Sequence, residues 1–410
     1  MDRVELLAPA GDLEKLKFAF IYGADAVYIG GQTFGLRASA KNFSFEEMKE
    51  GIEFAHERGK RVYVTLNIIP HNEDLNDLQG YLSALEKMKA DAVIVSDPGT
   101  IAYIREHNPG MEIHLSTQAN TTNYLTAGFW HSQGLPRVVL ARELSFNEIK
   151  ETIDKSPSSL GFEMFVHGAM CISYSGRCLL SNYLANRDAN RGECAHPCRW
   201  KYQLMEEKRP GEYFPVVEDE NGTYFFNSKD LCLIGDLKEI IESGVRSLKI
   251  EGRMKSLYYV ANTVRAYRAA IDSYYEDPYR YTFDEKWIEE LNKSSHRKYE
   301  RGFFSGRPDG NAQIYDTASY ERSYDFIGVV KDYNFGNGIA KIEQRNKFVI
   351  GDEIEIMSPG FQSFKQTVTE LYDENMNPVM DAPHPKGEFY MSTSQPVKAF
   401  DILRKLRKEG

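Results

Sequence analysis

Eight short apolar runs, each followed by a stretch with helical periodicity, recur through the first 275 residues of this chain. The runs are Leu6–Ala8, Ala26–Ile29, Val62–Thr65, Ala92–Val95, Ile113–Leu115, Val138–Leu140, Met164–Val166 and Ser247–Ile250. Continuous apolar strands that alternate with helices are typical of a parallel sheet buried on both faces. Eight such units predict a closed (β/α)8 barrel, and an open, doubly wound sheet is the alternative architecture.

The segments between the apolar runs carry helix signals. Phe45–Arg58 and Leu78–Met88 place apolar residues three and four positions apart among charged ones, which predicts two amphipathic helices. Asp12, which follows a Pro-Ala-Gly turn, has the side chain of an ordinary helix N-cap.

One unit breaks this alternation. About sixty residues separate the seventh run, which ends near His167, from the helix that begins near Leu231. The insertion, residues 168–231, contains a predicted β-hairpin around Asn221-Gly222. Long insertions after barrel strands lie on the carboxyl-terminal face, where barrel enzymes place their active sites. This face is where we expect the chemistry.

The remainder of the chain has a different pattern. Residues 277–322 form a charged helical and loop linker, and from residue 323 onwards short alternating strands are separated by Gly and Asn turns. This pattern predicts a small all-β barrel over residues 323–410, next to a barrel domain over residues 1–276. Such a module suits either RNA contact or packing and dimerisation.

Charge and hydropathy exclude several classes of protein. The 410 residues carry a net charge of −10, so a globally basic nucleic-acid coat is excluded while a local basic surface is not. No run approaches the roughly 20 apolar residues of a membrane-spanning helix. The amino terminus shows no secretory signal, so we expect a cytoplasmic protein without membrane contact.

Four of the five cysteines fall within 28 residues of the insertion. They are Cys171, Cys178, Cys194 and Cys198. Their spacing, C-x6-C-x15-C-x3-C, is wider than the paired knuckles of structural zinc sites, and a proline precedes the last cysteine. These features favour an iron–sulfur cluster, with zinc or buried thiols as alternatives. Cys232 stands apart and is predicted to be a core thiol, or a substitute fourth ligand.

Polar residues follow the predicted strands and should converge on one mouth of the barrel. They are Asn67, Asp97, Gln118, Arg142, Glu143, His167, Glu251 and Arg253. Of these, Glu251-Gly252-Arg253 is the most suggestive, because glycine permits close backbone approach and arginine binds a carboxylate with two hydrogen bonds. The structural alternative is an ion pair between Glu251 and Arg253 that closes the rim.

Hydrolase and nucleotide signatures are absent from the sequence: it has no G-x-S-x-G, no H-E-x-x-H and no P-loop. His167 and Cys171 are close enough in sequence for a Cys–His nucleophile. Because Cys171 has three further cysteines at cluster spacing, a metal-ligand role is the more economical interpretation.

The chain resembles a known family at four places. These are Glu5–Gly11, Gly23–Tyr28, Glu163–Cys178 and Lys249–Arg253, and the cysteine block is the most specific of them. Together they look like the collagenase-like unassigned peptidase family 32, across the whole chain. The stretch Arg191–Trp200 and the appended β-domain favour the branch of that family that modifies tRNA.

The resemblance implies an activity, cofactors and partners. Members of that branch hydroxylate the wobble uridine of tRNA to 5-hydroxyuridine with prephenate as co-substrate. They hold a [4Fe–4S] cluster on four cysteines that correspond to Cys171, Cys178, Cys194 and Cys198. A paired homologue can act as partner, and several members carry a peptidase or collagenase label.

These implications assign roles to the predicted mouth. Arg253 would bind a carboxylate of the small co-substrate, while Glu251 and His167 would manage protons near the cluster. Arginines in and near the insertion, Arg177, Arg187, Arg191 and Arg199 among them, would contact tRNA phosphates. The alternative functions are a collagenase-like peptidase and a binding scaffold without enzymatic activity.

Overall fold

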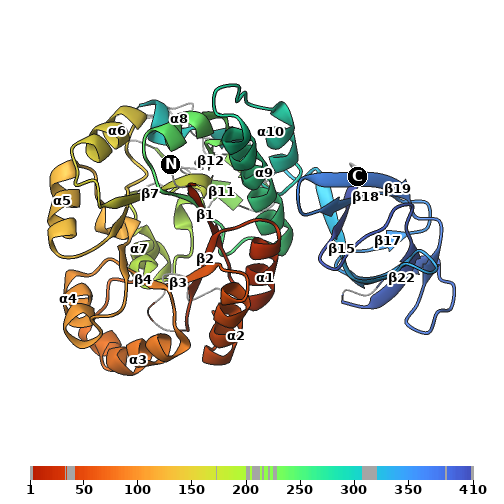
Figure 1. The fold of residues 1–410 in the computed structure, drawn as a ribbon, viewed down its shortest axis with the longest axis horizontal. Helices are drawn as coiled ribbons and strands as arrows, with labels where there is room; N and C mark the ends of the chain where they lie inside the picture. The colour runs from red at the N-terminus through yellow and green to blue at the C-terminus, as the bar shows by residue number, and fades with distance from the viewer. Residues whose placement is uncertain are drawn as a thin grey trace.

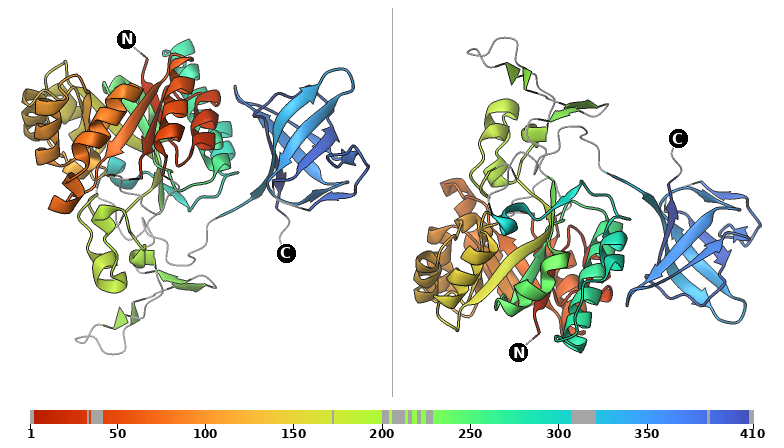
Figure 2. Two further views of the ribbon diagram at one scale, coloured as in Figure 1. Left: turned by 90° about the horizontal axis from the view of Figure 1, so that it is seen from below. Right: turned by 90° about the horizontal axis from the view of Figure 1, so that it is seen from above.

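We describe a computed structural model of the chain. It describes residues 3–32, 34, 42–171, 173–199, 229–306, 321–383 and 386–407, together with the short strands at 204–205, 213–214, 217–219 and 222–224. Within these residues, a barrel domain stands beside a smaller all-β domain, and the insertion projects from one end of the barrel (Figures 1 and 2). None of the described helices is both long and apolar enough to cross a membrane.

The predicted closed barrel is confirmed. Its parallel strands are β1 (Glu5–Pro9), β2 (Ala26–Gly30), β3 (Arg61–Leu66), β4 (Ala92–Val95), β5 (Ile113–Leu115), β6 (Arg137–Val139), β7 (Gly161–Ala169) and β13 (Ser247–Ile250). Each pairs with the next, and β13 pairs with both β7 and β1. Because the last strand joins the first, the sheet is closed rather than open and doubly wound.

Helices surround this barrel as the sequence periodicity predicts (Figure 1). They are α1 (Leu13–Ile21), α2 (Phe45–His56), α3 (Leu78–Met88), α4 (Pro98–His107), α5 (Tyr124–Ser132), α6 (Phe146–Asp154), α8 (Leu237–Glu242) and α9 (Leu257–Glu276). Asp12 caps α1 by accepting a hydrogen bond from the Lys15 amide, as expected, and Ser44 with Glu47 forms a capping box on α2.

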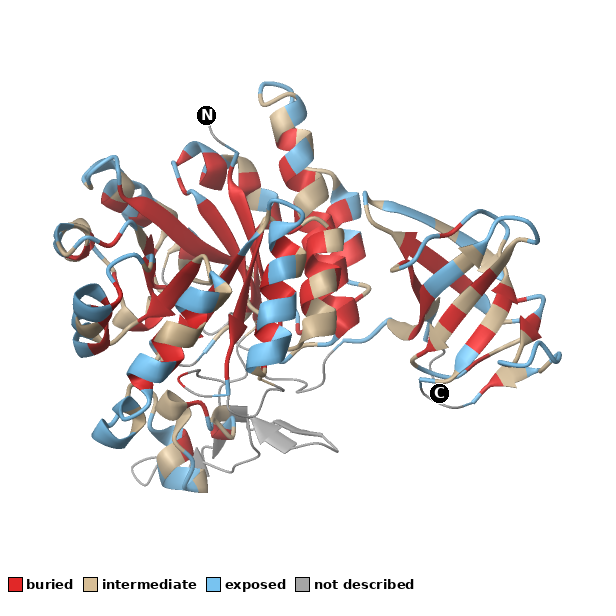
Figure 3. Ribbon diagram, turned by 60° about the horizontal axis from the view of Figure 1, so that its bottom comes forward, coloured by how far each residue is buried: buried red, intermediate tan, exposed pale blue. Residues whose placement is uncertain are grey.

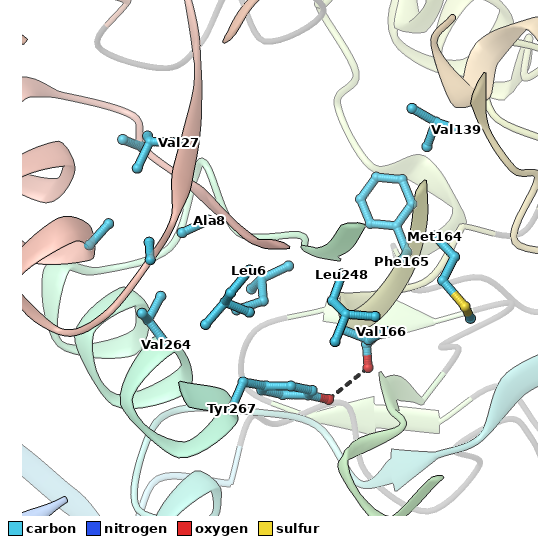
Figure 4. Packing of buried hydrophobic residues seen from close by; sticks show 14 of the residues in the cluster. Leu6, Ala8, Val27, Val139, Met164, Phe165, Val166, Leu248, Val264 and Tyr267 are labelled. Carbon is cyan, nitrogen blue, oxygen red and sulfur yellow. Dashed lines mark hydrogen bonds between the residues drawn. The ribbon is translucent and has the colours of Figure 1, made fainter. Parts of the chain in front are cut away.

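The outward faces of the strands pack on these helices. Leu6, Val27 and Leu248 belong to one continuous apolar core with residues of α9. Figure 4 shows this layer, in which the hydroxyl of Tyr267 on α9 donates to the carbonyl of Val166 at 2.8 Å. The hydrophobic effect of burying this layer holds the helices against the sheet.

The inward faces of the strands fill the barrel. Leu7, Tyr28, Tyr63 and Ile94 belong to a separate interior cluster. A network of buried charges lies below it, near the amino ends of the strands. Lys249 donates to Glu163 at 2.6 Å, Arg137 pairs with both Glu5 and Glu163, and Tyr63 donates to Glu5 at 2.6 Å. The barrel is therefore packed at this end.

The insertion after β7 carries its own short elements. They are α7 (Leu180–Ala185), two 3-10 turns (Ala189–Arg191 and Pro197–Arg199), the strand pair β8 (Leu204–Met205) and β9 (Tyr213–Phe214), and the pair β10 (Val217–Asp219) and β11 (Gly222–Tyr224). The β10–β11 pair confirms the predicted hairpin for the described residues. The chain then returns through β12 (Asp230–Cys232), which runs antiparallel to β7.

The carboxyl-terminal part begins on the barrel and ends in the second domain. After α10 (Glu285–Leu291) and β14 (Tyr299–Glu300), an antiparallel sheet has the order β19-β18-β23-β15-β16-β22-β20. Its strands are β15 (Tyr324–Asn334), β16 (Ile339–Gln344), β18 (Glu353–Ser358), β19 (Gln362–Thr367), β20 (Leu371–Tyr372), β22 (Glu388–Ser392) and β23 (Ile402–Leu406), and β17 (Phe348–Val349) pairs with β21 (Asp381–Ala382). The predicted all-β domain is confirmed, with its own apolar core.

Buried charges join the two domains. Arg404 of β23 is fully buried and pairs with Glu290 of α10 at 2.6 Å and with Glu355 of β18 at 2.8 Å. Burial alone would raise the pKa of Glu355, but Arg404 and Lys293 lower it to about 2. Apolar residues of both domains pack around this contact. Figure 3 shows buried residues, in red, on the strands and helices of both domains.

We expect Arg404→Met to destabilise the protein by about 3–5 kcal/mol at pH 7, because two buried carboxylates lose a shared partner. The loss should shrink as the pH falls from 4.5, where Glu355 takes up its proton in the unfolded chain, towards about 2, where it does so in the folded protein. Urea unfolding at several pH values measures both effects. Lys341→Met is the control, since Lys341 pairs with an exposed carboxylate, and it should cost at most about 1 kcal/mol. Equal losses in the two variants would contradict the assignment.

A candidate active site at the barrel mouth

Arg253 crosses the mouth of the barrel. It follows β13, and its guanidinium donates to Asn42 Oδ1 at 2.9 Å, in the segment after β2, and to Thr65 Oγ1 at 3.3 Å, near the end of β3. The residue is only 4 % exposed. A side chain at Gly30 would overlap the guanidinium, so glycine at this strand end makes room for the arginine. The planar fork is therefore fixed in place before any ligand arrives.

Glu251 points into the same mouth. Its carboxylate accepts a hydrogen bond from the hydroxyl of Tyr28 at 3.2 Å, and the same hydroxyl donates to the carbonyl of Ile250 at 2.9 Å. Tyr28 belongs to the interior cluster of the barrel. Sequence reasoning missed it as a site residue, although its inward position on β2, two residues before Gly30, follows from strand alternation.

Arg142, after β6, forms the other side of the mouth. Its guanidinium donates to the carbonyl of Ala169 at 2.9 Å and to Ser175 Oγ at 3.0 Å, and it lies 5.3 Å from the centre of the Phe165 ring. Burial alone would lower its pKa. Cys171, Glu143 and Glu251 instead raise the pKa above its ordinary value. Arg142 therefore stays charged and lies among the first cysteine and two carboxylates.

Several buried polar atoms at this end of the barrel have no hydrogen-bond partner among the described residues. They include Asn67 Oδ1, Gln118 Oε1 and Arg142 Nε. Buried polar atoms are nearly always satisfied, so a group of them in a mouth is typical of a place that water or a ligand occupies. Asp97, by contrast, caps α4 through the Thr100 amide, which gives it a structural role.

His167 lies elsewhere. An extra residue in β7 shifts its register against β13 between Phe165 and His167, so the imidazole packs against Tyr259 and Tyr267 of α9 and Tyr299 of β14. Burial lowers its pKa to about 3, so the ring is neutral at pH 7. Its backbone carbonyl accepts from the Glu251 amide at 2.8 Å. The structure thus joins His167 to Glu251 through the backbone and not through the imidazole.

The cysteine insertion lies over the mouth. Gly176 approaches the side chain of Gln118, and the amide of Ile69 donates to the carbonyl of Asn190 at 3.2 Å. Arg191 pairs with Glu73 at 3.0 Å and with Asp74 at 2.6 Å, both on the loop after β3. The loops after β3 and β5 therefore support the insertion, and Arg191 is engaged in this support.

The four clustered cysteines have the chemistry of a cluster-binding set. Cys171 is exposed, and Cys178, Cys194 and Cys198 are half-buried, all on the segments around α7. Four thiols on one segment, the first of them beside the cationic Arg142, suit a group whose thiolate ligands carry negative charge. Among the described residues, no three His, Cys, Asp or Glu side chains are gathered as around a single metal ion.

Cys232 is separate from this set. It is buried on β12 opposite His167, and burial raises the pKa of its thiol to about 12. Among the arginines expected to face RNA, Arg177 and Arg187 are exposed. The side chain of Arg199 lies outside the described residues.

Comparisons with known proteins agree with this architecture. The model of "Peptidase family U32" matches residues 11–314, and that of "Peptidase family U32 C-terminal domain" matches residues 322–404. "tRNA hydroxylation protein P1" of Bacillus subtilis is 43 % identical over 98 % of this chain and 94 % of its own length. "tRNA hydroxylation protein P" of Escherichia coli is 41 % identical, over 88 % and 87 %. "Collagenase" of Porphyromonas gingivalis is 33 % identical, over 90 % and 89 %.

We expect Gly30→Ala to destabilise the protein by about 1–3 kcal/mol, because the added methyl group displaces the Arg253 guanidinium. Gly80→Ala, on α3 with open space around it, should be neutral or stabilise by up to about 1 kcal/mol. Chemical denaturation measures both. The double variant Gly30→Ala/Arg253→Ala should lose less than the sum of its single variants. A Gly30→Ala protein as stable as Gly80→Ala would show that the contact is unimportant.

Proposed function

This chain belongs to peptidase family U32, and we propose that it is an enzyme that hydroxylates tRNA. The observation that carries the proposal is the similarity, over nearly the full length, to two proteins named for tRNA hydroxylation. The covered, polar barrel mouth supports it, because barrel enzymes act at this face and a modified base needs a recess to enter. We further propose that the product is 5-hydroxyuridine at the wobble position.

The proposed cofactor is a [4Fe–4S] cluster, held by Cys171, Cys178, Cys194 and Cys198. Thiolates are the ligands of such clusters, and each would bind a different iron, so the four side chains need not surround a single point. When bound, the cluster supplies redox chemistry next to the mouth. Arg142 lies within hydrogen-bonding range of Cys171 and favours the thiolate form through its positive charge.

The proposed co-substrate is a small carboxylate, prephenate in the family branch. Arg253 and Arg142 enter the mouth from opposite sides and provide two fixed cationic forks for two carboxylates. Each fork is oriented by a hydrogen bond to a neutral oxygen, Asn42 Oδ1 for Arg253 and Ser175 Oγ for Arg142. Arg142 extends the role that the sequence suggested for Arg253 alone.

Glu251 is the proposed proton acceptor. Its carboxylate faces the mouth, and the Tyr28 hydroxyl fixes the position of Oε2. For His167 we propose a positioning role: its carbonyl holds the Glu251 amide, while its neutral imidazole contacts tyrosines. The proton role that the sequence suggests for His167 stays a prediction.

We expect each single Cys→Ser change at the four clustered cysteines to remove most of the bound iron and the visible absorption of anaerobically purified protein. The same variants should fail to restore 5-hydroxyuridine in a knockout strain, as read by tRNA mass spectrometry. Cys232→Ser is the matched control and should keep both iron and activity, because Cys232 is buried on β12. Loss of iron in Cys232→Ser with full retention in Cys198→Ser would show that Cys232, and not Cys198, is the fourth ligand.

We expect Arg253→Lys to keep the fold and the iron content but to lose 5-hydroxyuridine formation, because an ammonium group cannot reproduce two parallel hydrogen bonds. Arg301→Lys is the control, since the guanidinium of Arg301 forms a comparable fork on Asp236, a carboxylate of the chain itself. If the Arg253→Lys enzyme hydroxylates normally, or if it unfolds, Arg253 is not the residue that binds the carboxylate. In the second case Arg253 would be structural.

The relative named collagenase favours a second candidate function, that of a peptidase. Incubation of the iron-loaded protein with gelatin and with denatured collagen tests it directly. Cleavage that survives in the Cys→Ser variants would support the peptidase candidate. Its absence, together with restored 5-hydroxyuridine in the knockout strain, would support the hydroxylase alone.

A further inference from the structure

Large apolar side chains are exposed on the insertion, next to the mouth. They are Tyr174, Leu179, Leu180, Tyr183 and Leu184, and we call them the α7 surface. Tyr183 is 81 % exposed, which is unusual for an aromatic side chain within a helix. Clusters of exposed apolar residues in soluble proteins mark sites of interaction. Figure 2 shows α7 standing clear of the barrel helices.

The α7 surface is continuous with the candidate active site. It begins at Tyr174, next to Ser175, which accepts a hydrogen bond from Arg142 in the mouth. Helix α7 itself lies between Cys178 and Cys194, and Asn190 at its far side contacts Ile69 of the loop after β3. A molecule that covers this surface therefore also reaches the mouth.

The charge of this segment differs from that of the whole chain. Residues 173–199 contain four arginines and two acidic residues, whereas the chain as a whole carries a net charge of −10. Arg177 and Arg187 are exposed and flank Tyr183 in sequence, and Arg177 follows Tyr174 by three residues. One of the acidic residues, Asp188, is engaged as the cap of the following 3-10 turn. The segment thus combines local positive charge with exposed aromatic rings.

We propose that the α7 surface binds the single-stranded RNA that flanks the target base. Tyr174 and Tyr183 stack on unpaired bases, the leucines contact their faces, and Arg177 and Arg187 contact phosphates. Stacking on protein rings replaces the base stacking that is lost when the target nucleotide turns into the mouth. The inference rests on the proposed function and names the surface by which that function finds its substrate.

The test measures the affinity of iron-loaded protein for a fluorescent anticodon stem-loop RNA at fixed salt. Tyr183→Ala should weaken binding by about 5- to 100-fold, the effect of losing one base–aromatic stack. Tyr183→Phe keeps the ring and should bind within about twofold of the parent. Tyr279→Ala is the matched control, because Tyr279 is 97 % exposed on the turn after α9. Arg187→Ala should weaken binding and reduce its salt dependence.

Two results would overturn the proposal. The first is a Tyr183→Ala protein that binds the stem-loop as tightly as the Tyr279→Ala protein, with unchanged melting temperature and iron content. The second is dissociation of a dimer by Leu184→Asp, seen by sedimentation equilibrium, with unchanged RNA affinity, which would make the surface an interface between copies of the chain.

The proposed function fails separately. If the parent binds the stem-loop through Tyr183 but does not restore 5-hydroxyuridine in the knockout strain, the α7 surface stands and the proposed chemistry falls. If the parent restores 5-hydroxyuridine and Tyr183→Ala matches it in both binding and modification, the surface falls and the chemistry stands.

Discussion

The buried ion pair between Lys249 of β13 and Glu163 of β7 supports the closure on which the rest of the structure depends. The whole cysteine insertion lies between these two strands in sequence, yet the strands are neighbours in the barrel. Burial acts to raise the pKa of Glu163, but Lys249 and Arg137 hold it below its ordinary value, so the carboxylate stays charged inside the barrel. Such a pair requires both strands in register, because either charge alone in this interior would be strongly unfavourable.

Closure determines where the polar residues can meet. With β13 fixed between β7 and β1, the residues that follow it reach the mouth, and Arg253 crosses to the ends of β2 and β3. The buried charges of Glu5, Arg137, Glu163 and Lys249 fill the other end of the barrel, and Tyr28 and Tyr63 of the interior cluster pack next to them. The insertion can therefore vary in length and content without disturbing the core, since it leaves and re-enters the sheet at two strands that are already paired.

Periodicity was enough to predict the barrel, because its eight strands are buried on both faces and read as continuous apolar runs. It was also enough to bring Glu251, Arg253 and Arg142 to one mouth. It could not place His167, since strand alternation alone directs that residue inward and a single extra residue in β7 reverses its face. Nor could it explain Gly30, whose hydrogen atom leaves room for an arginine more than two hundred residues away in sequence. Both depend on contacts between distant strands, which no local pattern contains.

Four buried or half-buried arginines fall into two groups with different physical tasks. Arg137 at the amino ends of the barrel strands and Arg404 between the domains are neutralised by buried carboxylates. Their ion pairs join strands of the barrel in the first case and the two domains in the second. In the mouth, the forks of Arg142 and Arg253 are oriented by a carbonyl, a hydroxyl and an amide oxygen. A neutral acceptor orients a guanidinium and leaves most of its positive charge to attract a further anion, whereas a carboxylate neutralises that charge. The same residue type is thus a structural tie in the first group and the proposed site for a carboxylate ligand in the second.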